Sequence, residues 1–281
     1  MSSSTIPETV RRLLASQPIE LPIFHPVALK LQKMLSDYDF TVEEVAHVAN
    51  EDMSLASQML KIANSPMYMG RSKVATIKEA VIRLGAQQVV NLVIAASQAS
   101  VHTSSNPALD NYMKQLWLHS HGSALAAKWL AHSCGMRGVA DETYLAALLH
   151  DVGKLYLLKS IERLVGAGVI SSMFDEDLIL EIFDAMHVEQ GYRLMQHWNF
   201  PSMYSDVIRD HHADQWDSVN KMLAIVRFSN LACRRIGLGL KHDPDLALIA
   251  TYEAEILDLG ENQILELEVM LEDSRDTDLL G

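Results

Sequence analysis

The sequence has little cysteine, few aromatic residues and no long apolar run, and each shortage excludes a class of protein. The two cysteines, Cys134 and Cys233, lie 99 positions apart, so we expect free thiols in a reducing compartment and neither a disulfide framework nor a Cys-rich metal site. Aromatic residues make up only 6% of the chain, which disfavours a β-fold. The least charged stretch, 89–99, is interrupted by polar residues and is shorter than the roughly 20 apolar residues that span a bilayer.

Positive charge is also scarce. The 281 residues carry 23 Lys and Arg against 36 Asp and Glu, a net charge of −13 at pH 7. Because DNA and anionic membranes attract basic proteins, we expect neither nucleic acid nor a membrane as a partner. The N-terminus has neither the basic region nor the apolar core of a signal peptide, and the sequence therefore predicts a cytoplasmic protein. Much of the excess charge lies in 251–281, with ten acidic residues and Arg275 as the one basic residue.

Helix-forming sequence is abundant, and 49% of the residues are hydrophobic. Capping boxes at Thr41–Glu44 and Thr76–Glu79 each predict the start of a helix, and Gly85 is expected to end the second one in the left-handed conformation. Ser54 is expected to cap a helix that ends before Asn64-Ser65-Pro66. Further helices are expected at about 87–100, 108–134, 141–158, 176–197, 202–212 and 217–236. The predicted fold class is all-α.

The chain is predicted to have four segments: an N-terminal extension at 1–20, a first helical part at 21–105, a second helical part at 106–240 and an acidic C-terminal segment at 241–281. The boundary near residue 105 rests on the short, polar, proline-bearing Ser104-Ser105-Asn106-Pro107. The C-terminal segment also carries apolar residues at helical spacing. Two alternatives remain for it: a helix packed on the body of the protein, or an acidic tail that serves as a docking surface.

Histidine is the residue type that points to chemistry, with twelve copies in the chain. A helical bundle can gather inward-facing side chains from separate helices, and neutral imidazole with carboxylate suits iron, manganese, nickel or zinc. Lys154 lies one turn after Asp151 and is expected to face a phosphate oxygen; these two residues are the catalytic candidates. The predicted metal ligands are His119, His150, Asp151, His187, His211 and His212.

A single histidine is more often a surface or hydrogen-bonded core residue than a metal ligand. We therefore predict structural roles for the remaining ones, His25, His47, His102, His121, His132, His197 and His242. A buried polar side chain without a partner costs about 1–3 kcal/mol, so the predicted ligands need a metal or mutual hydrogen bonds if they converge. A metal-free network of hydrogen bonds is thus the structural alternative.

Short motifs follow one another through most of the chain. They are Leu21–Leu31, Asn50–Leu60 with Ile62–Pro66, Ala80–Gly85, Trp117–Ser120, Leu148–Lys154, His187–Gly191, Trp198–Pro201 and His211-His212. In this order they resemble the HDOD domain, a branch of the HD superfamily of metal-dependent phosphohydrolases. The resemblance implies an N-terminal helical subdomain packed on an HD-like helical bundle. It also implies a role in bacterial signal transduction, since no general enzymatic activity is established for the family.

The resemblance extends to the related HD-GYP phosphodiesterases of cyclic di-GMP, whose metal ligands match the six residues above and whose phosphate-facing lysine matches Lys154. Three departures count against catalysis. Asn230 stands where HD enzymes end the site with Asp, Gln115 stands where some HD-GYP sites have an acidic ligand, and Ala213–Trp216 replaces the Gly-Tyr-Pro loop.

Two functions follow as hypotheses. The first is a stand-alone, non-catalytic regulatory module with a partly retained HD-type metal site, which binds a signalling protein or a nucleotide ligand. The second is a metal-dependent phosphohydrolase that acts on a cyclic dinucleotide or a nucleotide.

Overall fold

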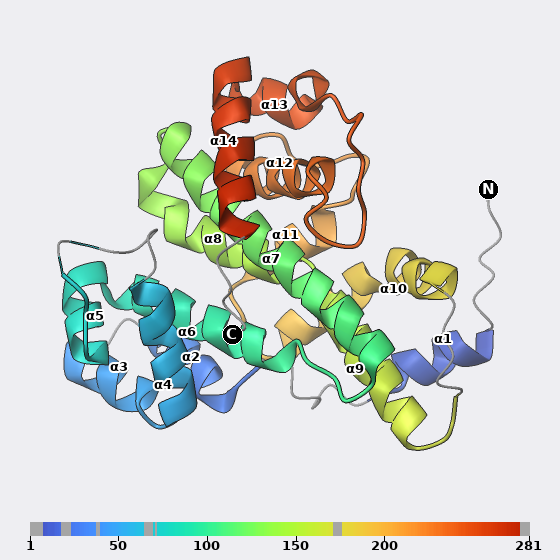
Figure 1. Ribbon diagram of the computed structural model, residues 1–281, viewed down its shortest axis with the longest axis horizontal. Coiled ribbons are helices and arrows are strands. Elements are labelled where there is room, and N and C mark those ends of the chain that lie inside the picture. The colour runs from blue at the N-terminus through green and yellow to red at the C-terminus, as the bar shows by residue number, and fades with distance from the viewer. Residues whose placement is uncertain are drawn as a thin grey trace. The chain divides into compact units, whose positions relative to one another are not determined.

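The computed structural model describes residues 8–17, 24–37, 40–64, 70, 72–170 and 176–275. Within these residues the secondary structure is helical and contains no strand, which confirms the predicted all-α fold (Figure 1). The described residues divide into two compact units, one within 24–101 and one made of 8–17 and 102–275. None of the described helices combines the length and the apolar character needed to cross a membrane.

The unit within 24–101 is built around one buried helix. This helix, α6, contacts the other four helices of the unit, and its residues from Gln88 to Ala99 are all buried. Polar as well as apolar side chains of α6 are covered, among them Asn91 and Ser97. The helices of the unit are α2 (Pro26–Asp37), α3 (Val42–Ala49), α4 (Met53–Ala63), α5 (Ile77–Leu84) and α6 (Ala86–Val101).

The predicted capping boxes lie at the starts of α3 and α5. Thr41 Oγ1 accepts a hydrogen bond from the Glu44 backbone N–H, and Glu44 accepts one in return from the Thr41 backbone N–H. Thr76 Oγ1 likewise accepts from the Glu79 N–H at 3.1 Å, but the Glu79 carboxylate bonds to the N–H that precedes Thr76. Gly85 ends α5 as predicted and has a positive φ of 87°, but its ψ of 158° places it outside the left-handed helical region that we predicted; a residue without a Cβ adopts this conformation too.

The predicted cap of α4 is wrong by two residues. Asp52, rather than Ser54, occupies the N-cap position, and its Oδ1 accepts from the Leu55 N–H at 2.8 Å. Both Asp and Ser are good N-cap residues, so the sequence around the start of this helix offers two competing positions. The end of the helix is as predicted, because α4 stops at Ala63 with Asn64 as its C-cap.

The larger unit packs around the long helix α7, which contacts α8, α9, α12 and α14 (Figure 1). The N-terminal helix α1 also belongs to this unit and packs on α9. Leu14 of α1 is fully buried, and the Tyr156 hydroxyl of α9 donates a hydrogen bond to the Gln17 carbonyl at 2.8 Å. Neither Cys134 nor Cys233 takes part in a disulfide, as predicted. The elements of the unit are α1 (Glu8–Ala15), α7 (Pro107–Ser133), η1 (Arg137–Val139), α8 (Ala140–Leu149), α9 (Val152–Gly166), α10 (Glu176–His197), α11 (Ser202–Asp210), α12 (Lys221–Arg235), η2 (Leu248–Ala250), α13 (Tyr252–Leu257) and α14 (Glu261–Arg275).

The prediction of a single helix at 141–158 is wrong, because the chain forms two helices there. α8 ends at Leu149 and α9 begins at Val152, so that His150 and Asp151 form the break between them. Apolar residues continue at helical spacing across the break, and the sequence pattern therefore does not reveal it. The start of α12 also differs from the predicted residue 217, since Asn220 caps it through the Leu223 N–H at 3.1 Å.

The C-terminal segment contributes a packed helix to the larger unit. α14 contacts α7, and its buried side chains include Leu267 and Leu271, both fully covered. Leu265 and Val269 on the same helix are more than half exposed. The acidic residues of α14 therefore accompany an amphipathic helix whose apolar stripe belongs to the core.

Replacing Leu271 with alanine is expected to lower the free energy of unfolding by about 2–5 kcal/mol, because it removes a fully buried side chain next to α7. Leu265→Ala is the matched control, since Leu265 is 58% exposed and such a change is worth about 0.5 kcal/mol or less. Urea denaturation of both variants measures the difference. Equal midpoints for the two variants would contradict the packing of α14.

Candidate metal centre

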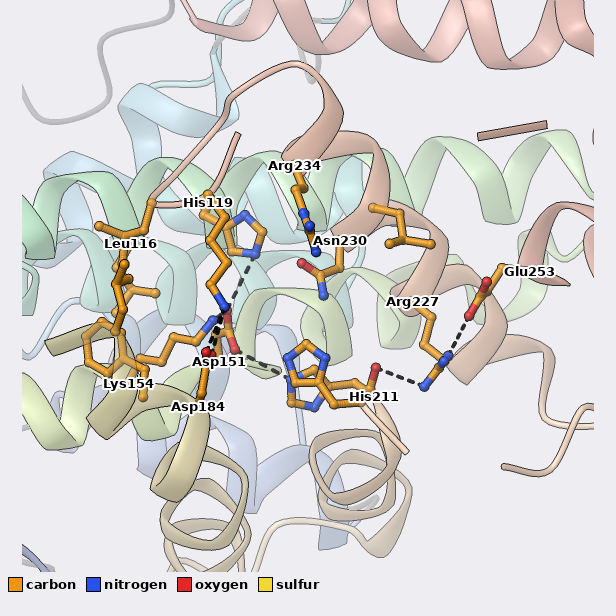
Figure 2. Close-up of a pocket in the computed structure, with 16 residues that line it drawn as sticks. Leu116, His119, Asp151, Lys154, Asp184, His211, Arg227, Asn230, Arg234 and Glu253 are labelled. Atoms are coloured by element: carbon orange, nitrogen blue, oxygen red, sulfur yellow. Dashed lines mark hydrogen bonds and ion pairs between the residues drawn. The ribbon is translucent and has the colours of Figure 1, made fainter. Parts of the chain in front are cut away.

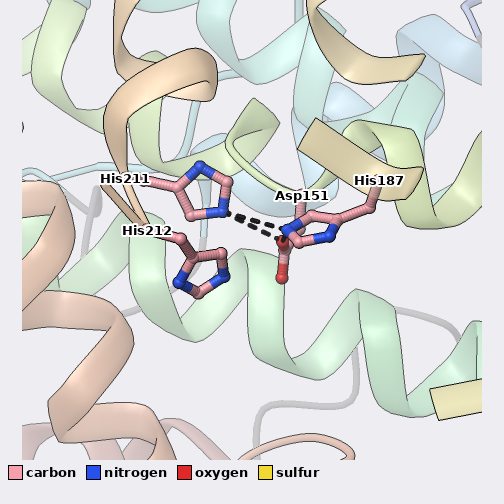
Figure 3. Close-up of side chains that lie close together, drawn as sticks. All are labelled: Asp151, His187, His211 and His212. Atoms are coloured by element: carbon pink, nitrogen blue, oxygen red, sulfur yellow. Dashed lines mark hydrogen bonds and ion pairs between the residues drawn. The ribbon is translucent and has the colours of Figure 1, made fainter. Parts of the chain in front are cut away.

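Four segments of the larger unit supply the predicted ligands. His119 projects from α7 and His187 from α10, while the other ligands lie at helix ends. His150 and Asp151 form the break between α8 and α9, and His211 and His212 directly follow α11. Figure 3 shows three of these imidazoles around the Asp151 carboxylate.

The Asp151 carboxylate, only 1% exposed, lies at the centre of the cluster. Its Oδ2 is 3.5 Å from His119 Nε2 and 3.3 Å from His150 Nε2. Its Oδ1 is 3.6 Å from His187 Nε2 and 3.5 Å from His211 Nε2. Four imidazoles therefore direct the same nitrogen, Nε2, toward one carboxylate.

The opposite nitrogen of each of these four rings is bound to a backbone carbonyl. The Nδ1 contacts are His119 to Leu238 O at 3.0 Å, His150 to Ala147 O at 2.7 Å, His187 to Phe183 O at 2.5 Å and His211 to Ile208 O at 2.7 Å. A carbonyl oxygen only accepts hydrogen bonds, so Nδ1 must be the protonated nitrogen. In a neutral ring Nε2 then carries the lone pair, which is the arrangement that metal-bound histidines adopt.

Desolvation keeps His119, His187, His211 and His212 neutral at pH 7. Desolvation lowers the pKa of His119, His187 and His211 from 6.5 to about 4, and the nearby Asp151 charge only partly opposes this shift. His212 is more exposed than these three, yet partial desolvation and the neighbouring His211 together lower its pKa to about 3. These rings consequently present lone pairs rather than N–H groups to the carboxylate.

Asp151 remains ionised in this environment. Burial alone would raise the pKa of its carboxyl group, but the positive charge of Lys154 and the imidazoles around the carboxylate hold the pKa well below 3.8. Lys154 Nζ lies 2.6 Å from Asp151 Oδ2. The site thus combines one buried negative charge with several uncharged nitrogen donors.

Two atoms in the cluster are buried without a hydrogen-bond partner, His150 Nε2 and Asp151 Oδ1. In addition, His187 Nε2 and His211 Nε2 face each other at 3.3 Å, although each has its proton on Nδ1. Lone pairs that face one another and a carboxylate are stabilised by a cation. The donor set therefore fits a divalent metal better than a network of internal hydrogen bonds.

The ligand atoms form two groups that share Asp151. One group is His119, His150 and Asp151, and the other is Asp151, His187, His211 and His212; within each group the ligand atoms lie within 4.8 Å of one another. Asp151 directs Oδ2 toward the first group and Oδ1 toward the second, so its carboxylate would supply an oxygen ligand to a divalent metal held by either group.

A cavity of about 180 Å³ opens on the cluster (Figure 2). Besides the ligands it is lined by cations and anions from several helices. Lys241 and Asp184 are ion-paired there at 2.8 Å, and Arg227 is paired with Glu253 at 2.7 Å. The charged residues that line it are Asp151, Lys154, Asp184, Arg227, Arg234, Lys241 and Glu253. Most of the cavity's charge is therefore neutralised in pairs.

The residues that mark departures from HD enzymes lie in different places. Asn230 lines the cavity, whereas Gln115 is not among the residues that line it. Among the described residues, both ligand groups contain Asp151 as their one carboxylate. His121, which we predicted to be structural, stacks on Trp117 with ring centroids 5.2 Å apart and belongs to neither group.

Two glycines allow α9 and α10 to approach closely enough to build the site. A Cβ on Gly153 would lie 1.9 Å from the His187 carbonyl oxygen and 2.7 Å from Gly191 N. A Cβ on Gly191 would lie 2.9 Å from an Ile208 methyl carbon. Since Asp151 precedes Gly153 by two residues, this close contact sets the distance between Asp151 and His187.

Replacing Gly153 with alanine is expected to destabilise the protein by about 1–3 kcal/mol or more, because backbone atoms must move apart to admit the Cβ. Metal affinity is expected to fall as well, since Asp151, directly before α9, and His187 on α10 are ligands of the same group. Gly166→Ala is the matched control at the other end of α9, where a Cβ would meet nothing within 4 Å. Thermal denaturation with and without Co²⁺ measures both effects, and similar behaviour of the two variants would contradict the role of Gly153.

Sequence reasoning missed the contacts that orient His119 and the turn after α11. The Leu238 carbonyl holds His119, and a Cβ on the next residue, Gly239, would lie 2.7 Å from His119 Cβ. Arg227 binds the turn that carries His211. No local motif marks these residues. Gly153 and Gly191, by contrast, lie inside motifs that the sequence displays, and their spacing was a signal that could have been used.

An all-helical protein with an HD-type cluster of histidines around one buried aspartate is the class that fold and site define. The family model for the HDOD domain matches residues 21–214, and the chain belongs to this family. A protein of Treponema pallidum (strain Nichols), described only as uncharacterized, is 24% identical over 229 residues. The match covers 79% of this chain and 44% of that protein, so the chain spans less than half the length of that relative.

Solved structures share the fold. An HDOD domain protein of unknown function from Geobacter sulfurreducens is 23% identical, with a TM-score of 0.70 over 95% of this chain and 94% of that one. A candidate metal-dependent phosphohydrolase from Shewanella amazonensis SB2B is 18% identical, with a TM-score of 0.71 over 96% and 97%. A candidate signal transduction protein from Marinobacter aquaeolei VT8 is 22% identical, with a TM-score of 0.66 over 98% and 65%. At these identities the likeness concerns the fold.

Proposed function

We propose that this protein is a metal-binding regulatory module of the HDOD family, in which the Asp151 cluster holds a divalent transition metal without hydrolysing a substrate. The observation that carries the proposal is the set of four Nε2 atoms directed at the buried Asp151 carboxylate, each with its Nδ1 bound to a carbonyl. Nitrogen and carboxylate donors favour iron, manganese, nickel or zinc. The regulatory partner would be a signalling protein or a nucleotide.

The shortage of carboxylates supports a binding role over hydrolysis. Among the described cavity residues, Asp184 is paired with Lys241 and Glu253 with Arg227, which leaves Asp151 as the carboxylate of both ligand groups. Asn230, a neutral side chain, lines the cavity where the resemblance to HD enzymes leads one to expect an aspartate. Two-metal hydrolysis relies on ions about 4 Å apart that are held and charge-balanced together.

Hydrolysis of a phosphoester is the second candidate, and the cavity favours it. The cavity opens directly on Asp151 and is lined by Lys154 and Arg234, two cations suited to phosphoryl oxygens. A bound divalent metal would supply a Lewis acid at the same place. In that function Lys154, held 2.6 Å from Asp151 Oδ2, would orient the phosphoryl group, and the substrate would be a cyclic dinucleotide or a nucleotide.

One experiment separates the two functions. The protein is purified without a histidine tag, its metal content is measured, and hydrolysis of bis(p-nitrophenyl) phosphate and cyclic di-GMP is assayed with Mn²⁺ and Fe²⁺. We expect bound metal but no turnover above buffer. The phosphohydrolase would be established instead if the wild type and Lys128→Met hydrolyse a substrate and Lys154→Met does not. Lys128 is a suitable control because it forms an ion pair with Asp141 at 2.9 Å and does not line the cavity.

A further inference from the structure

Arg227 on α12 binds the turn that carries two of the predicted metal ligands. Its Nη1 donates to the carbonyl oxygens of Asp210, His211 and Ala213, each at 3.0 Å. Its Nε donates to Glu253 Oε1 at 2.7 Å (Figure 2). One guanidinium therefore connects the end of α11 to α13.

The end of a helix explains why an arginine is useful here. The last carbonyls of a helix have no partner within it and carry partial negative charge, and α11 ends at Asp210, immediately before His211. The Arg227 and Glu253 side chains are only 16% and 8% exposed, and Trp216 covers the guanidinium with its ring centroid 4.9 Å from Cζ. A buried ion pair gains little net stability because both charges lose water, so a geometric role explains its presence better.

His212 depends on this turn more than any other ligand. The four buried histidines are each oriented by a hydrogen bond from Nδ1 to a carbonyl. Within the described part of the chain, His212, which is exposed, makes no such bond. Its ring lies against the rings of His211 and His187, with centroids 4.1 Å and 5.2 Å away, so its place follows from the backbone of the turn and from these neighbours. Arg227 holds the carbonyl groups on both sides of His212.

We propose that Arg227, held in place by Glu253, is a positioning residue that fixes the His211–His212 turn and thereby the ligand group of Asp151, His187, His211 and His212. The inference rests on the proposed metal-binding function and deepens it. Glu253 lies on α13, beyond residue 214 where the HDOD match ends. The C-terminal segment thus takes part in building the metal site.

The first test examines the metal-free protein, so that its result does not depend on metal binding. Imidazole nitrogens are observed by long-range ¹H–¹⁵N NMR in the wild type, in Arg227→Met and in Glu253→Gln. We expect both variants to shift the signals of His211 and His212 and to leave those of His119 and His150 in place. Unchanged signals for His211 and His212 would overturn the proposal, as would equal shifts of all the cluster's histidines.

Arg235→Met is the matched control. Arg235 lies on the same helix, and its Nε is 2.7 Å from Glu268 of α14, but it does not line the cavity. It therefore reproduces the loss of an ion pair between α12 and the C-terminal segment without touching the turn. Shifts of His211 and His212 in Arg235→Met as large as those in Arg227→Met would assign the effect to general loosening and overturn the proposal.

The second test titrates the full chain with Co²⁺ and follows its visible absorption. Loss of an outer partner of metal ligands weakens binding by about 10- to 100-fold. In Arg227→Met we expect Co²⁺ binding by the His211–His212 group to weaken by this factor. Co²⁺ binding by the His119–His150 group should keep the affinity of the wild type. Equal weakening of both groups would contradict the proposal. A wild type that binds no Co²⁺ would refute the metal-binding function, while the NMR comparison would still decide the positioning role.

Discussion

Replacing Asp151 with asparagine is expected to abolish metal binding by both ligand groups. Asp151 is the residue that the two groups share, and its carboxylate is the buried negative charge that four Nε2 atoms surround. Asparagine keeps the volume of the side chain but removes the charge and one oxygen. The loss of affinity should exceed the roughly 10- to 100-fold that follows from losing an outer-shell partner. Titration with Co²⁺ or Zn²⁺ measures it.

Asp184→Asn is the control for Asp151→Asn. Asp184 lines the same cavity, but it is 61% exposed and paired with Lys241, so its loss should leave metal affinity close to that of the wild type. A ligand that binds only the folded state raises its stability, and the rise in melting temperature caused by metal should therefore vanish in Asp151→Asn alone. Tight binding of metal by Asp151→Asn would show that the carboxylate is not at the centre of the site.

Acid is expected to destabilise the metal-free protein strongly between pH 6.5 and pH 4. Burial lowers the pKa of His119, His187 and His211 from 6.5 to about 4, so in this window the unfolded chain binds protons that the folded chain does not. Stability rises with pH wherever the unfolded state binds more protons, and it therefore falls as the pH drops from 6.5 to 4. A shift of this size is worth about 3 kcal/mol for one buried histidine.

Asp151 affects the stability of the protein in a separate, more acidic pH range. Its carboxyl group has a folded pKa well below 3.8, so its contribution to stability is complete above the unfolded pKa and is lost only as the pH falls through the lower, folded value. Acidification should thus remove the contribution of the histidines first and that of Asp151 afterwards. Since a metal binds the neutral rings, metal should leave the protein in the first window.

Urea denaturation in EDTA across pH 4 to 7 measures the slope of stability against pH. Each proton bound on unfolding contributes about 1.4 kcal/mol per pH unit, and His187→Gln should reduce the slope by close to that amount. His132→Gln removes an exposed histidine from the last turn of α7 and is the control for the loss of a histidine as such. A flat profile between pH 6.5 and 4 would contradict the burial of neutral rings.

The helices were largely predictable because their signals are local. Thr41 and Glu44 form a capping box from four consecutive residues, and Gly85 has the positive φ that only a residue without a Cβ adopts easily. The break at His150 and Asp151 was not predictable from periodicity, since apolar spacing continues through it. That break is a consequence of the tertiary structure, which directs both side chains into the cluster.

The candidate site was predictable as a set of residues and not as a geometry. His119 and His211 lie 92 positions apart, and only the order of the motifs suggested that they meet. The structure adds what orients them, namely the Leu238 carbonyl behind His119 and Arg227 behind the turn of His211. These contacts arise from helices brought together by packing, so no window of sequence contains both partners.

Anomalous X-ray scattering from crystals of the protein purified without a histidine tag is the most direct test of the central claim. Data collected on either side of the absorption edges of iron, manganese, nickel and zinc locate a bound ion and identify it. We predict a peak within ligand distance of Asp151 and of Nε2 atoms of the surrounding histidines. Crystals grown with added metal that show no peak, with the imidazoles bound only to one another and to Asp151, would contradict the assignment of a metal centre.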